Sequence, residues 1–318
     1  MSDERARSTD IECLERAIAA GELEACRAEL DQFELPALER AKLYCRLGEA
    51  LYCRGQVAEA VECAHAAFDL EHCAAIADFC AWLFSNCGHH RAAAAAYERL
   101  LEGRPGWAAG HRHASGSFAI AGDLDRAIQH AARASELEPH SVEFAIHTGC
   151  LFAGAGLHRD AIEYFSRAAT IAPDDPGVLR HMSGSLFALG ERANAVDLAL
   201  RAHKLAPGER GNAHHATELL LRCDRFAEAA ELISAALAHD SADPGGYRLL
   251  STAEMLRGRA EAALAAIERG LALAPEQAEY HQHRGNLLYR LVLQPEFMGM
   301  GSSFPVAAAG ALLMATPP

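Results

Sequence analysis

Aromatic residues and long apolar runs are scarce in this chain of 318 residues. Phe, Trp and Tyr make up 7% of the sequence, although hydrophobic residues as a whole reach 51%, with alanine prominent among them. Small side chains of this kind suit close helix–helix packing better than a thick sheet core. No segment reaches the ~18–20 uninterrupted apolar residues of a membrane-spanning helix, and no secretory signal is recognised at the start. We therefore expect a cytoplasmic protein with no membrane partner.

Positive charge is also in short supply. The chain has 29 Lys and Arg against 43 Asp and Glu, which gives a formal net charge of −14. Nucleic-acid surfaces need a basic stripe to neutralise phosphates, and anionic membranes attract basic segments. The composition therefore predicts no nucleic-acid partner and no membrane partner. The simplest interpretation is that the excess acid keeps an alanine-rich protein in solution.

Motifs for metal binding and catalysis are missing as well. Ten cysteines are present, eight of them before residue 90, but none forms a Cys-x-x-Cys pair. The seven-residue spacing of Cys73, Cys80 and Cys87 predicts one packed helix face, so we interpret the cysteines as reduced, small apolar fillers. Walker A and dinucleotide-binding glycine patterns are absent, and the Ser-Gly-Ser triplets at Ser115 and Ser183 fall inside predicted helices. We expect no catalytic residue, no cofactor and no metal, and hence no enzyme.

What the sequence does contain is a period of 34 residues. Three residue types keep this step, each at its own phase, with Asp224 and Ser241 standing in where a glycine and a proline are missing. The recurring residues are Pro105, Pro139, Pro173, Pro207 and Pro275; Gly88, Gly122, Gly156, Gly190 and Gly258; and Ala93, Ala127, Ala161, Ala195, Ala229 and Ala263. A period of this length predicts an array of helical hairpins, each needing a neighbour to bury its apolar face.

One repeat, residues 142–175, illustrates the pattern. We expect a first helix over about residues 142–155, with Gly156 as a left-handed stop. A second helix over about residues 159–171 would then end before Pro173, because proline cannot continue the hydrogen-bond ladder. Gly149 and Ala161 are small because the two helices of a hairpin approach closely there.

Gly149-x-x-Phe152, Ala161-x-x-x-Phe165 and Pro173 resemble the tetratricopeptide repeat (TPR) pattern of Gly-x-x-Tyr, Ala-x-x-x-Phe and Pro. The resemblance implies an all-α fold, an α-solenoid of stacked antiparallel helix hairpins forming a right-handed superhelix. We expect a degenerate helical repeat over residues 1–40 and a TPR array over 41–293, with about seven units and an incomplete last one. Alanine at 131 and 199, where the family has a bulky aromatic residue, is interpreted as drift.

The pattern breaks after residue 293. Proline and glycine crowd the segment where the last second helix should begin, so we expect residues 294–318 to be an irregular apolar tail. Two interpretations stay open: a displaced cap on the last helix, or a non-native end. The second leaves room for an alternative function, in which the array is the substrate-recruiting arm of a larger glycosyl- or sulfotransferase whose catalytic domain is absent from this chain.

A second pattern runs through the predicted first helices. The sixth residue of successive repeats is histidine in five cases out of six, with Leu249 as the exception. Arginine precedes it in every second repeat, and glycines gather around the same line. We call His113, His147, His181, His215 and His283 the histidine ladder. Glycine inside a helix costs roughly 1 kcal/mol relative to alanine, so one explanation of Gly116, Gly177, Gly184, Gly211 and Gly245 is close approach of a ligand backbone.

TPR proteins generally bind extended peptides on the concave surface lined by their first helices, so the resemblance implies a peptide-binding role for this ladder. It is similar to the asparagine ladder of O-linked N-acetylglucosamine transferases, with histidine at the matching phase. Arginine suits acidic side chains, and histidine would make binding sensitive to pH between about 5 and 8. In the alternative interpretation, each histidine only bonds a neighbouring repeat and holds the solenoid together.

The sequence thus predicts a non-catalytic, bacterial TPR scaffold that binds a protein or an extended, possibly acidic, peptide along its concave face. It leaves the partner's identity and the oligomeric state open. The predicted binding residues are Arg112, His113, His147, Arg180, His181, His214, His215, Arg248 and His283.

Overall fold

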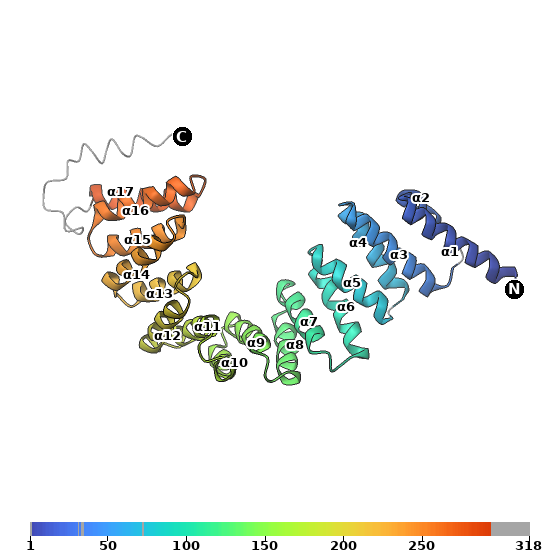
Figure 1. The fold of residues 1–318 in the computed structure, drawn as a ribbon, viewed down its shortest axis with the longest axis horizontal. Helices are drawn as coiled ribbons and strands as arrows, with labels where there is room; N and C mark the ends of the chain where they lie inside the picture. The colour runs from blue at the N-terminus through green and yellow to red at the C-terminus, as the bar shows by residue number, and fades with distance from the viewer. Residues whose placement is uncertain (1, 31, 33–34, 72, 294–318) are drawn as a thin grey trace. The chain divides into compact units, whose positions relative to one another are not determined.

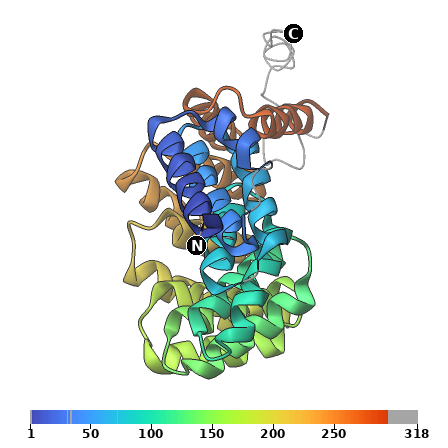
Figure 2. The ribbon, with the colours of Figure 1, turned by 90° about the vertical axis from the view of Figure 1, so that its right-hand side faces the viewer.

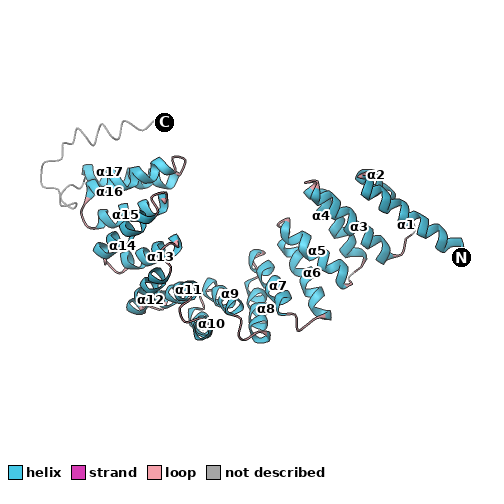
Figure 3. Cartoon of the chain, viewed as in Figure 1, coloured by secondary structure: helices cyan, strands magenta, loops and turns pink. Residues whose placement is uncertain are grey.

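The computed structural model describes residues 2–30, 32, 35–71 and 73–293 (Figure 1). These residues form seventeen α-helices and no strand (Figure 3). The helices are α1 (Ser2–Ala20), α2 (Leu23–Leu30), α3 (Ala37–Cys53), α4 (Val57–Leu70), α5 (Ala74–Asn86), α6 (His90–Gly103), α7 (Ala108–Ile120), α8 (Leu124–Leu137), α9 (Val142–Gly154), α10 (His158–Ile171), α11 (Pro176–Ala188), α12 (Arg192–Leu205), α13 (Arg210–Arg222), α14 (Phe226–His239), α15 (Pro244–Leu256), α16 (Ala260–Leu273) and α17 (Ala278–Leu293). None of these helices is long and apolar enough to cross a membrane.

The helices belong to two compact units, divided between Ala155 and Gly156. In unit 1, which holds α1–α9, helix α3 packs on α4, α5 on α6 and α7 on α8, and each hairpin stacks on the next. In unit 2, which holds α10–α17, the hairpins α11–α12, α13–α14 and α15–α16 stack in the same way. Figure 2 shows the stacked helix pairs from a second direction. The predicted α-solenoid of stacked hairpins is confirmed.

The first helices of neighbouring hairpins also contact each other. Helix α3 contacts α5 in unit 1, and α11, α13, α15 and α17 form a continuous series of such contacts in unit 2. Each unit therefore has a surface built from first helices alone, and the predicted binding residues lie on these helices. This arrangement brings residues one repeat apart in the sequence next to each other.

The predicted left-handed stops end the first helix of each hairpin. Gly55, Gly88, Gly122, Gly156, Gly190 and Gly258 have φ between +76° and +88°. Asp224, the residue at the missing glycine position, has φ +58° and is the one non-glycine residue with positive φ among the described residues. Aspartate tolerates this conformation better than most residues because its short polar side chain can bond locally. The sequence prediction of the stops is confirmed, including the substitution.

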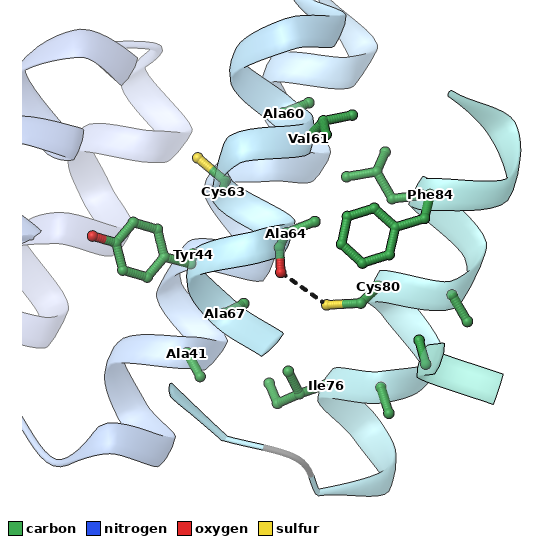
Figure 4. Close-up of a cluster of buried hydrophobic side chains, with 14 of the residues drawn as sticks. Ala41, Tyr44, Ala60, Val61, Cys63, Ala64, Ala67, Ile76, Cys80 and Phe84 are labelled. Atoms are coloured by element: carbon green, nitrogen blue, oxygen red, sulfur yellow. Dashed lines mark hydrogen bonds between the residues drawn. The ribbon is translucent and has the colours of Figure 1, made fainter. Parts of the chain in front are cut away.

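The periodic alanines form the contact between the two helices of each hairpin. Ala93, Ala127, Ala161, Ala195, Ala229 and Ala263 are all fully buried, with 0% exposure. Cysteine is a small core residue between neighbouring hairpins of unit 1, where Cys80 of α5 packs against Phe84 and against Ala64 of α4, and its Sγ donates to Ala64 O at 3.3 Å (Figure 4). Burial raises the pKa of Cys26 to about 11, so its thiol stays protonated. The filler interpretation holds for buried cysteines such as these but not for the exposed Cys53.

The structure describes the predicted N-terminal repeat but not the predicted C-terminal tail. Helices α1 and α2 occupy the segment predicted as a degenerate repeat, with Cys26 buried at the alanine phase. The array's last described helix is α17. The predicted apolar tail, residues 294–318, lies outside the described residues, as does the expected break in the last repeat.

Candidate functional site

The histidine ladder occupies one fixed position of the first helices. Each member is the sixth residue of its helix, on α7, α9, α11, α13 and α17. His113 is exposed, and the other four are half-buried. A position in the second turn places each side chain beside the first helix of an adjacent hairpin, so the neighbouring repeats decide what each ring contacts.

Three ladder members hydrogen-bond a serine of the preceding repeat. The distances from serine Oγ to histidine Nε2 are 3.0 Å for Ser115–His147, 2.6 Å for Ser183–His215 and 3.1 Å for Ser251–His283. Ser183 Oγ also donates to Arg180 O at 2.7 Å, so its one proton is already used. His215 Nε2–H is therefore the donor in the pair with Ser183. These bonds tie adjacent first helices together, which favours the structural interpretation for these three histidines.

The other two members stack on an aromatic ring of the preceding second helix. The ring centroids of Tyr97 and His113 are 5.5 Å apart with an interplanar angle of 18°. Phe165 and His181 repeat this arrangement at 5.9 Å and 16°. Stacking leaves the ring edge of the exposed His113 available to solvent.

The two arrangements alternate from His113 to His215, so the same type of histidine contact returns every two repeats, or every 68 residues. The stacking rings Tyr97 and Phe165 stand 16 residues before their histidines. At the same step before the serine-bonded His147 and His215 stand Ala131 and Ala199. The sequence alone suggests drift at these alanines. In the structure, however, the histidine that follows each of them bonds a serine instead of stacking on a ring. The departure from the family pattern is thus regular.

Burial lowers the pKa of every ladder histidine below its ordinary value. The largest effect is at His215, where burial, helped by the charge of Arg180, lowers the pKa to about 4. The histidines are therefore neutral at pH 7. Desolvation disfavours the imidazolium form, so we now expect any pH dependence of binding that these histidines cause to fall at a lower pH than the range of 5 to 8.

The predicted arginines meet different partners. Arg112 Nη2 lies 2.8 Å from Glu143 Oε1 of the next repeat, so its charge is already paired. Gly211 occupies the position relative to Arg180 that Glu143 occupies relative to Arg112. Arg180 Nη1 lies 2.5 Å from the place where a Cβ of residue 211 would stand. Among the described residues Arg180 makes no ion pair. The sequence pattern alone treated the two arginines as equivalent, and the partner in the next helix distinguishes them.

His214, the remaining predicted histidine, belongs to a separate contact. Its Nε2 lies 2.6 Å from Oδ2 of the buried Asp243, and its ring covers Gly245. Arg248 lies two helical turns before the end of α15 and is half-buried. The structure thus brings Arg180, His181 and His215 together in unit 2, and uses His214 to join α13 to the start of α15.

The glycines around the ladder mostly make room for the protein's own side chains. A Cβ at Gly211 would meet Arg180, one at Gly245 would meet His214, and one at Gly184 would lie 3.7 Å from His215 Cε1. Only Gly116 of this group has open space. The hypothesis that these glycines admit a ligand backbone is therefore wrong for Gly211 and Gly245, since side chains of the adjacent repeat fill that space, and it stays a prediction for the others.

Unit 1 contains a cavity of about 550 Å³ that the repeat pattern of the sequence did not predict. Its lining includes both tryptophans of the chain, Trp82 and Trp107, together with Asp78 and Phe79 from the same face of α5. Phe79 is the sixth residue of α5 and so occupies the phase of the histidine ladder. Extending the phase comparison one repeat toward the N-terminus would have found it. Among the described residues no group of three or more His, Cys, Asp or Glu side chains could hold a metal ion.

Comparison with known proteins gives structural neighbours but no sequence relatives. No protein-family model matches the chain, and no curated protein matches its sequence. A tetratricopeptide repeat protein from Parabacteroides merdae ATCC 43184 is similar in structure, with a TM-score of 0.57, 12% identity and coverage of 78% of this chain and 98% of its own. A chain of the Cut9–Hcn1 hetero-tetramer of APC/C has a TM-score of 0.52 and 15% identity, over 83% of this chain and 51% of its own.

A third neighbour is YrrB, described as a TPR protein with an unusual peptide-binding site. It has a TM-score of 0.46 and 15% identity, and the match covers 60% of this chain and 99% of YrrB. The stacked hairpins, the glycine stops and the neighbours with TM-scores above 0.5 agree on one architecture. The chain has the fold of a tetratricopeptide repeat protein.

Proposed function

We propose that the chain is a non-catalytic scaffold that binds an acidic protein segment or extended peptide on the first helices of unit 2. Helices α11, α13 and α15 carry the surface, and Arg180 is its central charge. The observation that supports this proposal is the unpaired guanidinium of Arg180 above Gly211. A carboxylate of the partner would supply the ion pair that no described residue of the chain makes with Arg180.

The comparison with unit 1 shows why the missing partner matters. Arg112 and Arg180 stand 68 residues apart at the same repeat phase, and Glu143 and Gly211 stand at the same phase in the following helices. Glu143 pairs with Arg112, whereas Gly211 has no side chain to offer. The guanidinium of Arg180 is planar and can bind a carboxylate through two parallel hydrogen bonds.

The backbone around Arg180 adds to the attraction for an anion. Gly211 is the second residue of α13, so Arg180 lies over the first turn of that helix. The N-terminus of a helix carries a partial positive charge and unsatisfied N–H groups. Ser183 and His215 hold the region in place through their hydrogen bond of 2.6 Å and the Ser183 bond to Arg180 O.

The test supplies the missing carboxylate from the chain itself. A Gly211→Glu variant would place an acid where Arg112 has Glu143, and Gly211→Gln is the matched neutral control. The added Cβ meets only the far end of the flexible Arg180 side chain. Fluorescence anisotropy would measure binding of a labelled glutamate-rich peptide and of the same peptide with glutamine in place of glutamate.

We expect the wild type and Gly211→Gln to prefer the glutamate peptide, and Gly211→Glu to lose about tenfold in affinity for it, about 1.4 kcal/mol. Arg180→Gln should lose a similar amount. Equal binding of the glutamate peptide by the Glu and Gln variants would show the proposal to be wrong. The transferase-arm alternative and the cytoplasmic, bacterial setting stay predictions.

A further inference from the structure

Unit 1 has a pocket of different chemistry on its own first helices. The cavity of about 550 Å³ lies within the size range of small-molecule and side-chain sites. We call it the aromatic pocket, lined by Phe79, Trp82, Tyr97, Trp107 and His113. Helices α5 and α7 supply most of these rings, and Tyr97 of α6 forms the base, since it is only 8% exposed.

Two carboxylates, Glu49 of α3 and Asp78 of α5, complete the lining. Both side chains are exposed, and among the described residues neither makes an ion pair. Other exposed acids of unit 1 do pair with an arginine, as Glu62 does with Arg27. The pocket thus combines electron-rich ring faces with two carboxylates that no described residue pairs with.

The rings are held in place before any ligand arrives. The indole of Trp107 lies close against α7 at Gly110, where an added Cβ would stand 2.1 Å from the ring. Trp82 is held edge-on by Tyr52 at 5.3 Å and contacts Phe79 at 6.1 Å. Trp82 nevertheless keeps 44% of its surface exposed. An exposed tryptophan fixed by its neighbours loses little conformational entropy when a ligand covers it.

We propose that the aromatic pocket binds the arginine side chain of a basic peptide segment. A guanidinium stacks on tryptophan and tyrosine faces through cation–π attraction, and its N–H edge can reach carboxylates at the same time. Glu49 and Asp78 would accept those hydrogen bonds while Trp82 and Trp107 sandwich the flat group. The net charge of −14 on the chain adds a long-range attraction for a basic partner.

Arginine fits this lining better than the other basic side chains. The ammonium group of lysine is a compact, strongly hydrated charge without a flat face, so it would use the carboxylates but leave the stacking surfaces unfilled. This inference stands on unit 1 alone and does not rest on the acidic-peptide site of unit 2. The two can fail separately because they use opposite ligand charge.

The chain offers a direct optical signal for the test. Trp82 and Trp107 are its only two tryptophans, so intrinsic fluorescence reports on the pocket. The full chain would be titrated with a short Gly-Ser peptide that carries one arginine, and with matched peptides that carry citrulline or lysine at that position. Citrulline keeps the shape of arginine without the charge.

We expect saturable fluorescence quenching by the arginine peptide, with citrulline weaker by about tenfold or more, as cation–π and ionic contributions of this size predict. The double variant Glu49→Gln, Asp78→Asn should lose this discrimination. A charge-matched control, Asp69→Asn with Glu138→Gln, changes two exposed acids of unit 1 outside the pocket and should keep it.

Equal affinity for arginine and citrulline peptides would overturn the proposal, and so would unchanged discrimination in the pocket double variant. Tighter binding of lysine than of arginine would overturn the assignment of the occupant. A Gly110→Ala variant provides an independent check, because its Cβ would displace the Trp107 ring. It should shift the emission spectrum and weaken arginine binding, with helicity by circular dichroism confirming that the chain is folded.

Discussion

Helix α5 of unit 1 and helix α11 of unit 2 present opposite chemistry from the same repeat positions. The fifth, sixth and ninth residues are Asp78, Phe79 and Trp82 in α5. In α11 they are Arg180, His181 and Gly184. The first set offers an acid and two aromatic rings, and the second offers a cation, a polar ring and bare backbone.

The difference lies at exposed or half-buried positions, whereas the residues that fix the hairpins are the same in both units. Buried alanines and left-handed glycines fix the hairpins in both units, while these surface positions are left to vary. Unit 1 uses them to form an aromatic pocket with unpaired carboxylates. In unit 2 they carry the histidines that bond serines of neighbouring helices, and they carry Arg180, which makes no ion pair among the described residues. Four predictions, each tested with a pair of variants, would break or sharpen this comparison.

Removing a ring that supports the ladder should have the largest effect. Phe165→Ala deletes a side chain that is 1% exposed and on which His181 stacks. Loss of a buried phenylalanine costs about 3–5 kcal/mol of unfolding free energy. Phe84→Ala, at a 0% exposed position, is the matched change in unit 1. Hydrogen exchange should show the loss of protection centred in unit 2 for the first variant and in unit 1 for the second. Equal loss in both units for either variant would contradict independent local packing.

Exchanging the charge at the fifth position should weaken binding of the ligand proposed for that unit. Asp78→Arg puts a cation at the rim of the aromatic pocket and should lower affinity for an arginine peptide by more than tenfold, through like-charge repulsion. Arg180→Asp should do the same for a glutamate peptide. Each variant should leave binding of the other peptide within about twofold, as measured by calorimetry. Loss of both activities in either variant would mean that the two surfaces are not separate sites.

Acid should destabilise the ladder. The pKa of His215 is about 4 in the folded chain, below the ordinary value near 6.5, so the unfolded chain takes up a proton first as the pH falls. Stability is therefore full above about pH 6.5 and is lost progressively toward pH 4. For His215 alone the loss between pH 7.5 and 5.5 is about 1 kcal/mol.

Urea denaturation at the two pH values checks this expectation. His215→Leu copies the leucine that stands at this phase in the chain as Leu249, and it should reduce the pH dependence. His239→Leu, at an exposed position of α14, is the control and should retain it. An unchanged pH dependence in the His215 variant would show that this ring does not carry the effect.

The smallest effect concerns the one irregular helix stop. Asp224 has φ +58° where the other stops are glycines. Asp224→Gly should stabilise unit 2 by about 0.5–1 kcal/mol, because glycine adopts this conformation without a steric cost. Gly190→Ala, at φ +88°, should destabilise it by about 1 kcal/mol. Thermal denaturation would measure both, and a lower melting temperature for the glycine variant would contradict the assignment.

Much of the fold could be predicted from the sequence because each repeat is a local unit. The helix stops, the proline boundaries and the buried alanines depend on backbone conformation and on contacts within a hairpin. The sequence also predicted that Asp224 takes the position of the missing glycine. Less of the candidate site could be predicted, since the phase of the ladder identified the positions but not their contacts.

The reason is that these contacts join repeats rather than lie within one. Arg112 and Arg180 are identical in the pattern, yet one has Glu143 and the other has Gly211 in the next helix. The aromatic pocket collects Glu49, Phe79 and Trp107 from different repeats, and no single repeat contains enough of it to form a motif.

By itself the sequence determined the repeat length, the helix ends and the small residues at which helices approach, because these depend on steric limits that act over a few residues. Only the tertiary structure decided which side chains are already satisfied. Hydrogen bonds and ion pairs act over about 3 Å, and the stacking of hairpins chooses which groups come that close. That choice pairs His215 with Ser183, places no carboxylate of the described residues against Arg180, and surrounds the space beside Glu49 and Asp78 with aromatic rings.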